Sequence, residues 1–389
     1  MMEKMSPVLT EANLISIRRN LHQIPEPALK EVKTQAYVLK VISGMNQEFL
    51  QVRVPENLST AVLVLVSGFR PRRTIAYRAD MDALPIEEKT DLPFSSTNPG
   101  YMHACGHDIH MAVALGVLSY FSVHQPEDNL IFFFQPAEEA ESGAKRAYES
   151  GIFTGEWKPD EFYALHDTPD LPAGQIGCRM GTLFAGTTEV TIDIEGVGGH
   201  AAFPQDSKDA LMAAAALIMQ AQTIISRGID PVQGGVLTLG KIQAGRARNI
   251  IAGHAHIEGT IRGLSQNTIQ RIDDQLLALC RGLEEAYSVT VSCRLHQGGY
   301  LPVVNDPHLT KNLIHIMKAL PGVDYSTVEP AMTGEDFGYL LARFPGTMFW
   351  LGVDDESCLH TATFNPKESA IGKGVEAVCS FISERMHEV

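Results

Sequence analysis

The feature that most constrains the fold is an alternation of short apolar runs with helix-like segments in the first part of the chain. The runs predicted as strands include Ala61–Val66, Thr74–Ala79 and Asn129–Phe134, the last being the continuous apolar sequence NLIFFF. Helices are predicted over His107–Val123 and Glu139–Tyr148. Strands that alternate with helices build a largely parallel sheet with helices on its faces. We therefore predict an α/β domain with a mixed, largely parallel sheet.

The order of the predicted helices and strands changes near Gly186. From there to about His296 the order is strand, helix, strand, strand, helix, strand, which is the ferredoxin-like α+β pattern. After this stretch the helix and strand signals of the first domain resume. We predict a catalytic metal-binding domain over residues 1–185 and 298–389, and an inserted lid or dimerisation domain over residues 186–297, a normal domain size.

Charge and composition restrict the classes of partner. The 389 residues carry a formal net charge of -15, and no run of Lys or Arg stands out. Such a chain is poorly suited to bind nucleic acid or an anionic membrane, and no uninterrupted apolar stretch has the length of a membrane span. The segment up to Asn20 has no apolar core of signal-peptide length, and the six cysteines include no CxxC pair. We predict a cytoplasmic protein that binds neither nucleic acid nor membrane.

The densest cluster of reactive side chains is HACGHDIH, His103–His110. Cys105 and His107 are two residues apart, so both can face one point from a turn before the predicted helix. Thiolate and imidazole are good ligands for borderline metals such as zinc. The alternative, a buried cysteine beside surface histidines, suits a lone residue better than a cluster of several ligand types.

A pair of carboxylates, Glu138 and Glu139, closely follows the apolar strand NLIFFF. Adjacent carboxylates repel unless they bind something, and one can ligate a metal while its neighbour acts as a general base. The competing interpretation is that the dipole of a helix favours acidic residues at its start. The position of the pair after a predicted strand favours the functional interpretation, because open α/β sheets bind ligands beyond the carboxyl ends of their strands. Equivalent positions after other predicted strands are taken by Asp80, Asp82, His166 and His360.

Seven sequence blocks, in a fixed order, cover nearly the whole chain and resemble one known family. They are RADMDALPIEE, MHACGHDIHMA, FFFQPAEEAESGA, GVGGHAAFP, ARNIIAGHAHIEGTIRG, TGEDFGY and LHTATFNP. The chain resembles the dinuclear-metal amidohydrolases, which include hippurate hydrolases and indole-acetyl-amino-acid hydrolases. The resemblance implies an α/β metal domain interrupted by a ferredoxin-like domain that often dimerises, and hence a homodimer. It also implies two divalent metal ions as cofactors, for which zinc, cobalt, nickel or manganese would suit the mixed ligands.

The resemblance assigns roles to the residues of the metal domain. Glu138 would be the general base and later the general acid, and Cys105 would bridge the two ions as a thiolate. Asp80 stands where relatives with an HxD motif have a metal-binding histidine, a ligand that His107 can supply instead. Asp82 matches a carboxylate that orients a ligand. The metal ligands implied are Cys105, His107, Glu139, His166 and His360.

Other matched residues would act on the substrate. His200 matches a histidine that stabilises the developing oxyanion and that comes from the partner subunit in relatives. Arg248, Asn249 and Arg262 resemble residues that hold the substrate, and an arginine can pair with its carboxylate. An arginine on a strand is otherwise typical of a solvated face.

The segment from His166 to Val190 resembles one branch of the family, the enzymes that deacetylate N-acetyl-L,L-diaminopimelate to diaminopimelate and acetate in lysine biosynthesis. Asp167 stands where the wider family more often has Val, and its carboxylate could position the site or meet the distal ammonium of this small-molecule substrate. One alternative is an amidohydrolase of hippurate-like or other N-acyl amino acids. A catalytically silent binding protein would lack a ligand or the base, yet all are present. A purely structural dimerisation protein would leave the clustered ligands unexplained.

Overall fold

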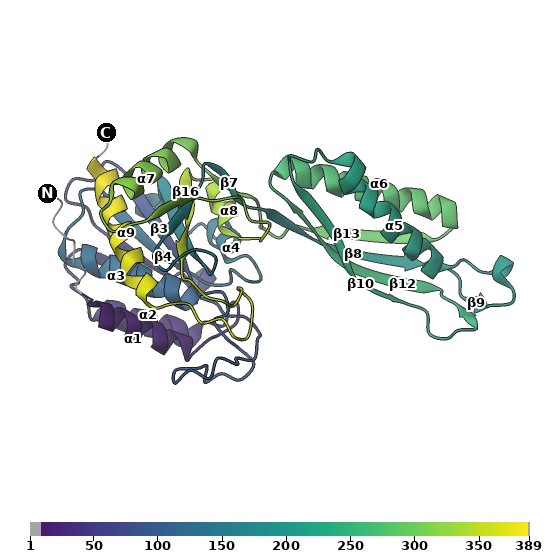
Figure 1. Ribbon diagram of the computed structural model, residues 1–389, viewed down its shortest axis with the longest axis horizontal. Coiled ribbons are helices and arrows are strands. Elements are labelled where there is room, and N and C mark those ends of the chain that lie inside the picture. Colours follow the sequence, from purple (N-terminus) through teal and green to yellow (C-terminus); the bar gives the residue numbers. More distant parts are fainter. Residues whose placement is uncertain (1–8, 388–389) are drawn as a thin grey trace. The chain divides into compact units, whose positions relative to one another are not determined.

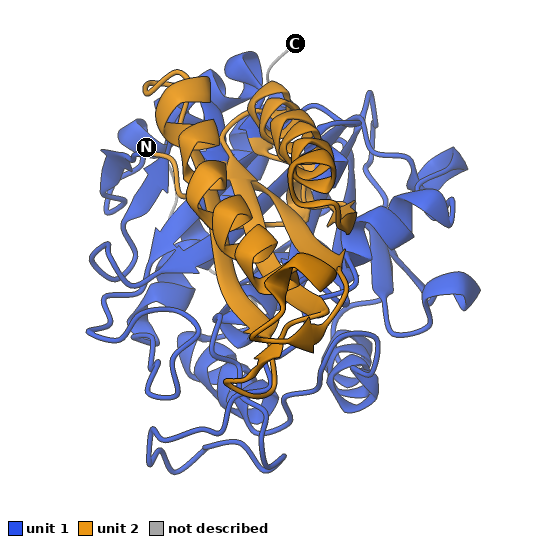
Figure 2. Ribbon diagram, turned by 90° about the vertical axis from the view of Figure 1, so that its right-hand side faces the viewer, with its two compact units in different colours: residues 1–183, 304–329, 339–389 blue, residues 184–303, 330–338 orange. Residues whose placement is uncertain are grey.

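The computed structural model describes residues 9–387 and divides into two compact units (Figure 1, Figure 2). Within the described residues, unit 1 comprises residues 9–183, 304–329 and 339–387, and unit 2 comprises residues 184–303 and 330–338. The predicted insertion, residues 186–297, lies wholly within unit 2. The later segment joins it because the Ala185 amide donates to the Ala331 carbonyl (2.9 Å) and Arg262 Nη1 donates to the Met332 carbonyl (2.9 Å).

Unit 1 is built on an eight-stranded mixed sheet. Its central strands are parallel: β4 (Asn129–Gln135), β3 (Thr74–Asp80), β5 (Glu161–Thr168) and β16 (Gly346–Gly352). β2 (Val62–Val66) pairs antiparallel with β4 and with β1 (Leu50–Arg53), while β6 (Ile176–Cys178) pairs antiparallel with β16 and parallel with β15 (Tyr325–Thr327). The predicted fold class is confirmed.

Both faces of this sheet are buried, as is usual where helices cover a parallel sheet. On one face, alternate residues such as Tyr77 and Phe132 join the main apolar core. On the other, Phe133 and Phe162 pack edge-on against Phe153, with ring centroids 5.2 and 5.5 Å apart. The helices of unit 1 are α1 (Glu11–His22), α2 (Val32–Ser43), α3 (His107–Val123), α4 (Gly143–Glu149), α7 (Pro307–Ala319) and α9 (Ser369–His387), with short 3-10 turns at Glu56–Leu58 and Gly155–Trp157.

Helix α3 is buried along nearly its whole length, which accounts for its mostly apolar composition after the first turn. Helix α4 differs from the prediction, which placed its start at Glu139. It begins at Gly143 because Ala137, Glu141 and Ser142 have positive φ angles of 61°, 71° and 47°, which an α-helix cannot contain.

Unit 2 has the predicted order of elements. Its antiparallel sheet runs β10 (Gly235–Ala244), β12 (His254–Gly263), β8 (Gly186–Glu195), β13 (Thr290–His296). Two helices, α5 (Ala210–Gly228) and α6 (Gln266–Tyr287), lie side by side over one face (Figure 2). Alternate residues of β8 point at these helices, which is why its burial alternates.

The remaining short elements lie at the ends of unit 2 and at its junction with unit 1. β9 (Gly199–His200) and β11 (Ile250–Ile251) form a small ribbon, followed by a 3-10 turn at Pro204–Asp206. β7 (Gly181–Phe184) pairs with β14 (Val303–Asn305), and helix α8 (Phe337–Leu341) crosses the second boundary. By length and composition α5 is the one described helix that is apolar enough to cross a membrane. Its residues Ala213, Leu217 and Ile224 are nevertheless buried against the sheet.

Candidate metal centre

The carboxyl ends of the central parallel strands of unit 1 bring distant residues together. Asp80 is the last residue of β3, the segment of Glu138 and Glu139 follows β4, and His166 lies near the end of β5. His360 comes from the loop after β16, where its amide donates to the Ala104 carbonyl at 2.8 Å. Because these strands are neighbours in the sheet, their ends form one site.

Cys105 lies at the centre of this site. Its Sγ atom is 3.5 Å from His166 Nε2 and 3.2 Å from His360 Nε2. The ligand atoms of Cys105, His107 and His166 lie within 4.8 Å of one another, and so do those of Cys105, Glu139 and His360. Cys105 is therefore common to two groups of three ligands, an arrangement that suits a thiolate shared by two cations.

The imidazoles are oriented as metal ligands usually are. His107 Nδ1 lies 2.9 Å from the Asp82 carbonyl oxygen, and His166 Nδ1 lies 2.8 Å from the Asp167 carbonyl oxygen. A proton on each Nδ1 leaves the lone pair on Nε2, directed into the site. His107 Nε2 and Glu139 Oε1 are buried and have no hydrogen-bond partner. A bound cation beside each of these atoms would satisfy it, so the residues present fit a metal.

The electrostatics of the site favour positive charge. Burial, reinforced by the charges of Glu139 and Glu138, raises the pKa of the Cys105 thiol well above its usual value. Burial alone would lower the pKa of His107, but the carboxylates of Asp80, Asp82 and Glu139 outweigh it and raise that pKa to about 10. An excess of buried anionic groups of this kind is stabilised by metal cations.

Glu138 and Glu139 lie in a loop rather than at the start of a helix. Asp82 Oδ1 accepts the Glu138 amide at 2.9 Å, and Asp82 Oδ2 accepts the Glu139 amide at 3.0 Å. Glu139 Oε1 is 3.8 Å from His107 Nε2, and Glu138 Oε2 is 4.0 Å from the same atom. The helix-dipole interpretation of these two glutamates therefore does not apply.

A layer of fully buried charge lies beneath the ligands. His110, one helical turn after His107, has Nδ1 2.6 Å from Asp80 Oδ1 and Nε2 3.0 Å from Asp167 Oδ1. Asp80 also pairs with Arg78 Nη1 at 2.7 Å. The Asp167 carboxylate is wholly buried here, facing the other charged groups rather than solvent. His110 was not assigned a role from the sequence, although its spacing of three residues from His107 on a helix is a signal for it.

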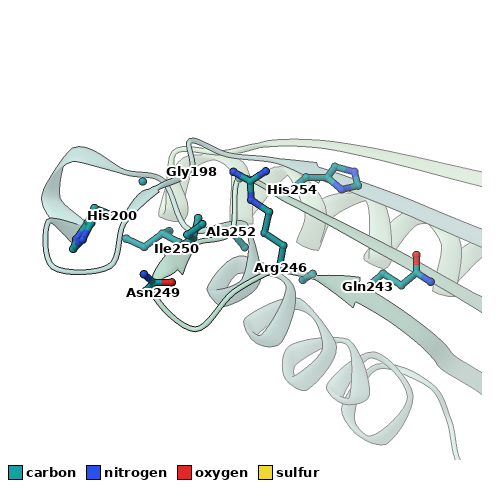
Figure 3. Close-up of a pocket in the computed structure, with 13 residues that line it drawn as sticks. Gly198, His200, Gln243, Arg246, Asn249, Ile250, Ala252 and His254 are labelled. Atoms are coloured by element: carbon teal, nitrogen blue, oxygen red, sulfur yellow. The ribbon is translucent and has the colours of Figure 1, made fainter.

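The matched residues of unit 2 fall into two places. His200 lies in β9 and Asn249 immediately precedes β11, and the Ala201 amide donates to the Asn249 carbonyl at 3.1 Å. His200 and Asn249 line a hollow of about 900 Å³ together with Arg246, which was not predicted from the sequence (Figure 3). Arg248 is exposed nearby in the chain. Arg262 pairs with Thr187 at the other end of the sheet, so the structure does not bring it near His200.

Comparison with known proteins gives the class of this arrangement. The profile of peptidase family M20/M25/M40 matches residues 76–384, and the chain belongs to that family. This confirms the family resemblance of the sequence blocks.

Individual relatives share a large part of their sequence with this chain. The N-acetyldiaminopimelate deacetylase of Limosilactobacillus reuteri is 64% identical over 379 residues, which are 97% of this chain and 100% of that protein. The protein of the same name from Pediococcus pentosaceus is 58% identical, covering 96% and 97% of the two chains. The crystal structure of the Bacillus subtilis YXEP protein, a dinuclear metal binding peptidase from the M20 family, has a TM-score of 0.85 and 28% identity, with 97% and 99% coverage.

Proposed function

We propose that this protein is a metal-dependent amidohydrolase that deacetylates N-acetyldiaminopimelate, releasing diaminopimelate and acetate in lysine biosynthesis. The observation that carries the proposal is the ligand cluster around Cys105 with Glu138 beside it. The substrate is inferred from the relatives named N-acetyldiaminopimelate deacetylase, which are similar along nearly the whole chain.

The site suits two divalent ions. Cys105, His107 and His166 would hold one, and Cys105, Glu139 and His360 the other. The mixture of thiolate, imidazole and carboxylate accommodates zinc, cobalt, nickel or manganese. Such ions, when bound, acidify water and polarise an acyl carbonyl.

Glu138 carries the proton in the proposed reaction. Its side chain lies beside the ligands, with little exposure to solvent. A carboxylate in this position removes a proton from the attacking water and returns it to the departing amine nitrogen. His200 is proposed to donate a hydrogen bond to the acyl oxygen as negative charge develops there. The imidazole of His360 is 52% exposed, so the site is open to water and substrate on that side.

Substrate recognition is assigned to residues of unit 2. Arg248 and Asn249 are exposed and able to meet a carboxylate of the substrate. Arg262, at the other end of the sheet, donates to the Met332 carbonyl and has further donors, which are proposed to contact another part of the substrate. Asp167 is proposed to position His110 and His166 rather than to meet the distal ammonium, because its carboxylate is buried among them.

The protein is further proposed to be a cytoplasmic homodimer. β10 is an edge strand of the unit 2 sheet, and next to it α5 exposes Leu211, Met212 and Met219 by 42%, 52% and 74%. An apolar stripe beside an unpaired edge strand is typical of a protein interface. A second copy of the chain is the occupant proposed for this α5–β10 face.

The test is a substrate panel on chelated protein restored with individual metals. Chelation is expected to abolish turnover, and a divalent ion to restore it. N-acetyldiaminopimelate is expected to be preferred over N-acetyl amino acids with apolar side chains and over N-benzoylglycine. Each buried polar group of the site that the wrong substrate leaves without a hydrogen-bond partner costs about 1–3 kcal/mol of binding free energy, enough for a clear preference.

Two results would contradict the proposal. Full activity in protein shown by elemental analysis to be metal-free would exclude the metal mechanism. An equal or better specificity constant for N-benzoylglycine would assign the protein to the hippurate-like hydrolases instead.

A further inference from the structure

The carboxylate of Glu31 is buried near the metal centre, and no step described above uses it. Glu31 is fully buried, just before helix α2. Its Oε1 atom accepts two backbone hydrogen bonds, from the Leu29 amide at 2.9 Å and from the Ala137 amide at 2.9 Å. The second bond joins it to the loop that carries Glu138, more than a hundred residues further along the chain.

Three successive amides of that loop are held by buried carboxylates. Glu31 accepts from Ala137, and Asp82 accepts from Glu138 and Glu139. These N–H groups have no helical partner, because α4 begins only at Gly143. Two carboxylates from different parts of unit 1 thus determine the direction in which the loop leaves β4.

The conformation of Ala137 needs such support. Its φ angle is 61°, in the left-handed region that residues with a Cβ atom rarely adopt. Leu29, the other residue that donates to Glu31, has the same φ angle of 61°. One carboxylate oxygen therefore holds two left-handed residues, one in its own turn and one immediately before the proposed general base.

The position of Glu31 is electrostatically costly. Burial, together with the nearby charge of Asp82, raises the pKa of Glu31 to about 7. A buried carboxyl group is destabilising unless its oxygens accept hydrogen bonds. If Glu31 stabilised only the turn at Leu29, its carboxylate would not need to accept the Ala137 amide as well.

We propose that Glu31 is a positioning residue for the hydrolysis, which holds the Ala137 backbone so that the Glu138 carboxylate meets the reacting water and the amine nitrogen. The inference rests on the proposed function, in which Glu138 is the base. A misplacement of about 1 Å can cost a hundred-fold in rate, so a support of this kind affects turnover without touching the substrate.

Glu26 offers a matched control in the same segment. Its Oε2 atom accepts from the Lys33 and Thr34 amides and so caps the start of α2. No hydrogen bond of its side chain among the described residues reaches the Ala137–Glu139 loop. Its loss disturbs the α2 end of the segment but not the support of Glu138.

The experiment compares E31A, E31Q and E26A as full-length, metal-loaded proteins. E31A is expected to lower kcat about ten-fold or more, with KM and metal content near those of the unchanged protein. E31Q keeps the accepting oxygen and is expected to recover most of the turnover. E26A is expected to lower the melting temperature while leaving kcat unchanged.

Several outcomes overturn the inference. It is wrong if kcat of E31A equals that of E26A, or if E31A loses metal in proportion to turnover, which would mean that Glu31 supports a ligand instead. If E31A does not fold, E31D replaces it, because the shorter side chain cannot reach Ala137, and equal kcat in E31D and E31Q contradicts the proposal. Normal turnover in E138Q with full metal content would instead overturn the proposed function itself.

Discussion

At the scale of single residues, Glu138 and Glu139 are neighbours in the chain for which we propose different roles, Glu138 as the general base and Glu139 as a metal ligand. Glu139 Oε1 lies 3.4 Å from His360 Nε2, and Glu138 Oε2 lies 4.0 Å from His107 Nε2. E138Q should keep the metal content and lower kcat about a hundred-fold or more, because an amide cannot carry the proton. E139Q should lower the metal content, because it replaces an anionic ligand. Elemental analysis beside steady-state kinetics separates the two, and an E138Q protein with near-normal turnover would show that Glu138 is not the base.

At the scale of one element, the turn before α3 depends on Gly106, which has a φ angle of 75°. A Cβ atom there would lie 2.2 Å from Asp167 Oδ2, and that carboxylate cannot move freely because it is buried beside His110. G106A is expected to lower stability by more than about 1–2 kcal/mol, the usual cost of the left-handed conformation, and to lower metal content. Gly151 is the control, since it has a φ of 73° and nothing within 4 Å of its Cβ position. Equal losses of melting temperature and metal in G106A and G151A would exclude the steric role of Asp167.

At the scale of the whole molecule, the α5–β10 face is expected to set the oligomeric state. M219K places a charge in the most exposed part of the apolar stripe on α5 and should convert the dimer to a monomer, as measured by light scattering after size exclusion. Phe69 in unit 1 is 62% exposed, and F69K is the control that should leave the mass unchanged. A monomeric mass for the unchanged protein, or a dimeric mass for M219K, would refute this interface.

The sequence by itself determined the fold class, and it predicted the two kinds of domain and, through the family resemblance, the ligand set. Hydrophobic periodicity is a local property, so NLIFFF predicts a buried strand, and the spacing within HACGHDIH predicts two of the ligands, Cys105 and His107. The prediction of a helix from Glu139 was wrong because it, too, used only local sequence. Glutamates favour a helix start locally, but here their amides donate to the carboxylate of Asp82, a residue that follows strand β3.

Only the tertiary structure decided how distant groups meet. The approach of His166 and His360 to Cys105, the burial of Asp167 and the hydrogen bond between Glu31 and Ala137 all depend on which strands are neighbours in the sheet. Strand order is set by packing over long sequence separations, and side-chain periodicity carries no record of it. A hydrogen bond from a particular amide to one carboxylate exists only after that order is fixed, because it depends on distance in space rather than on spacing along the chain.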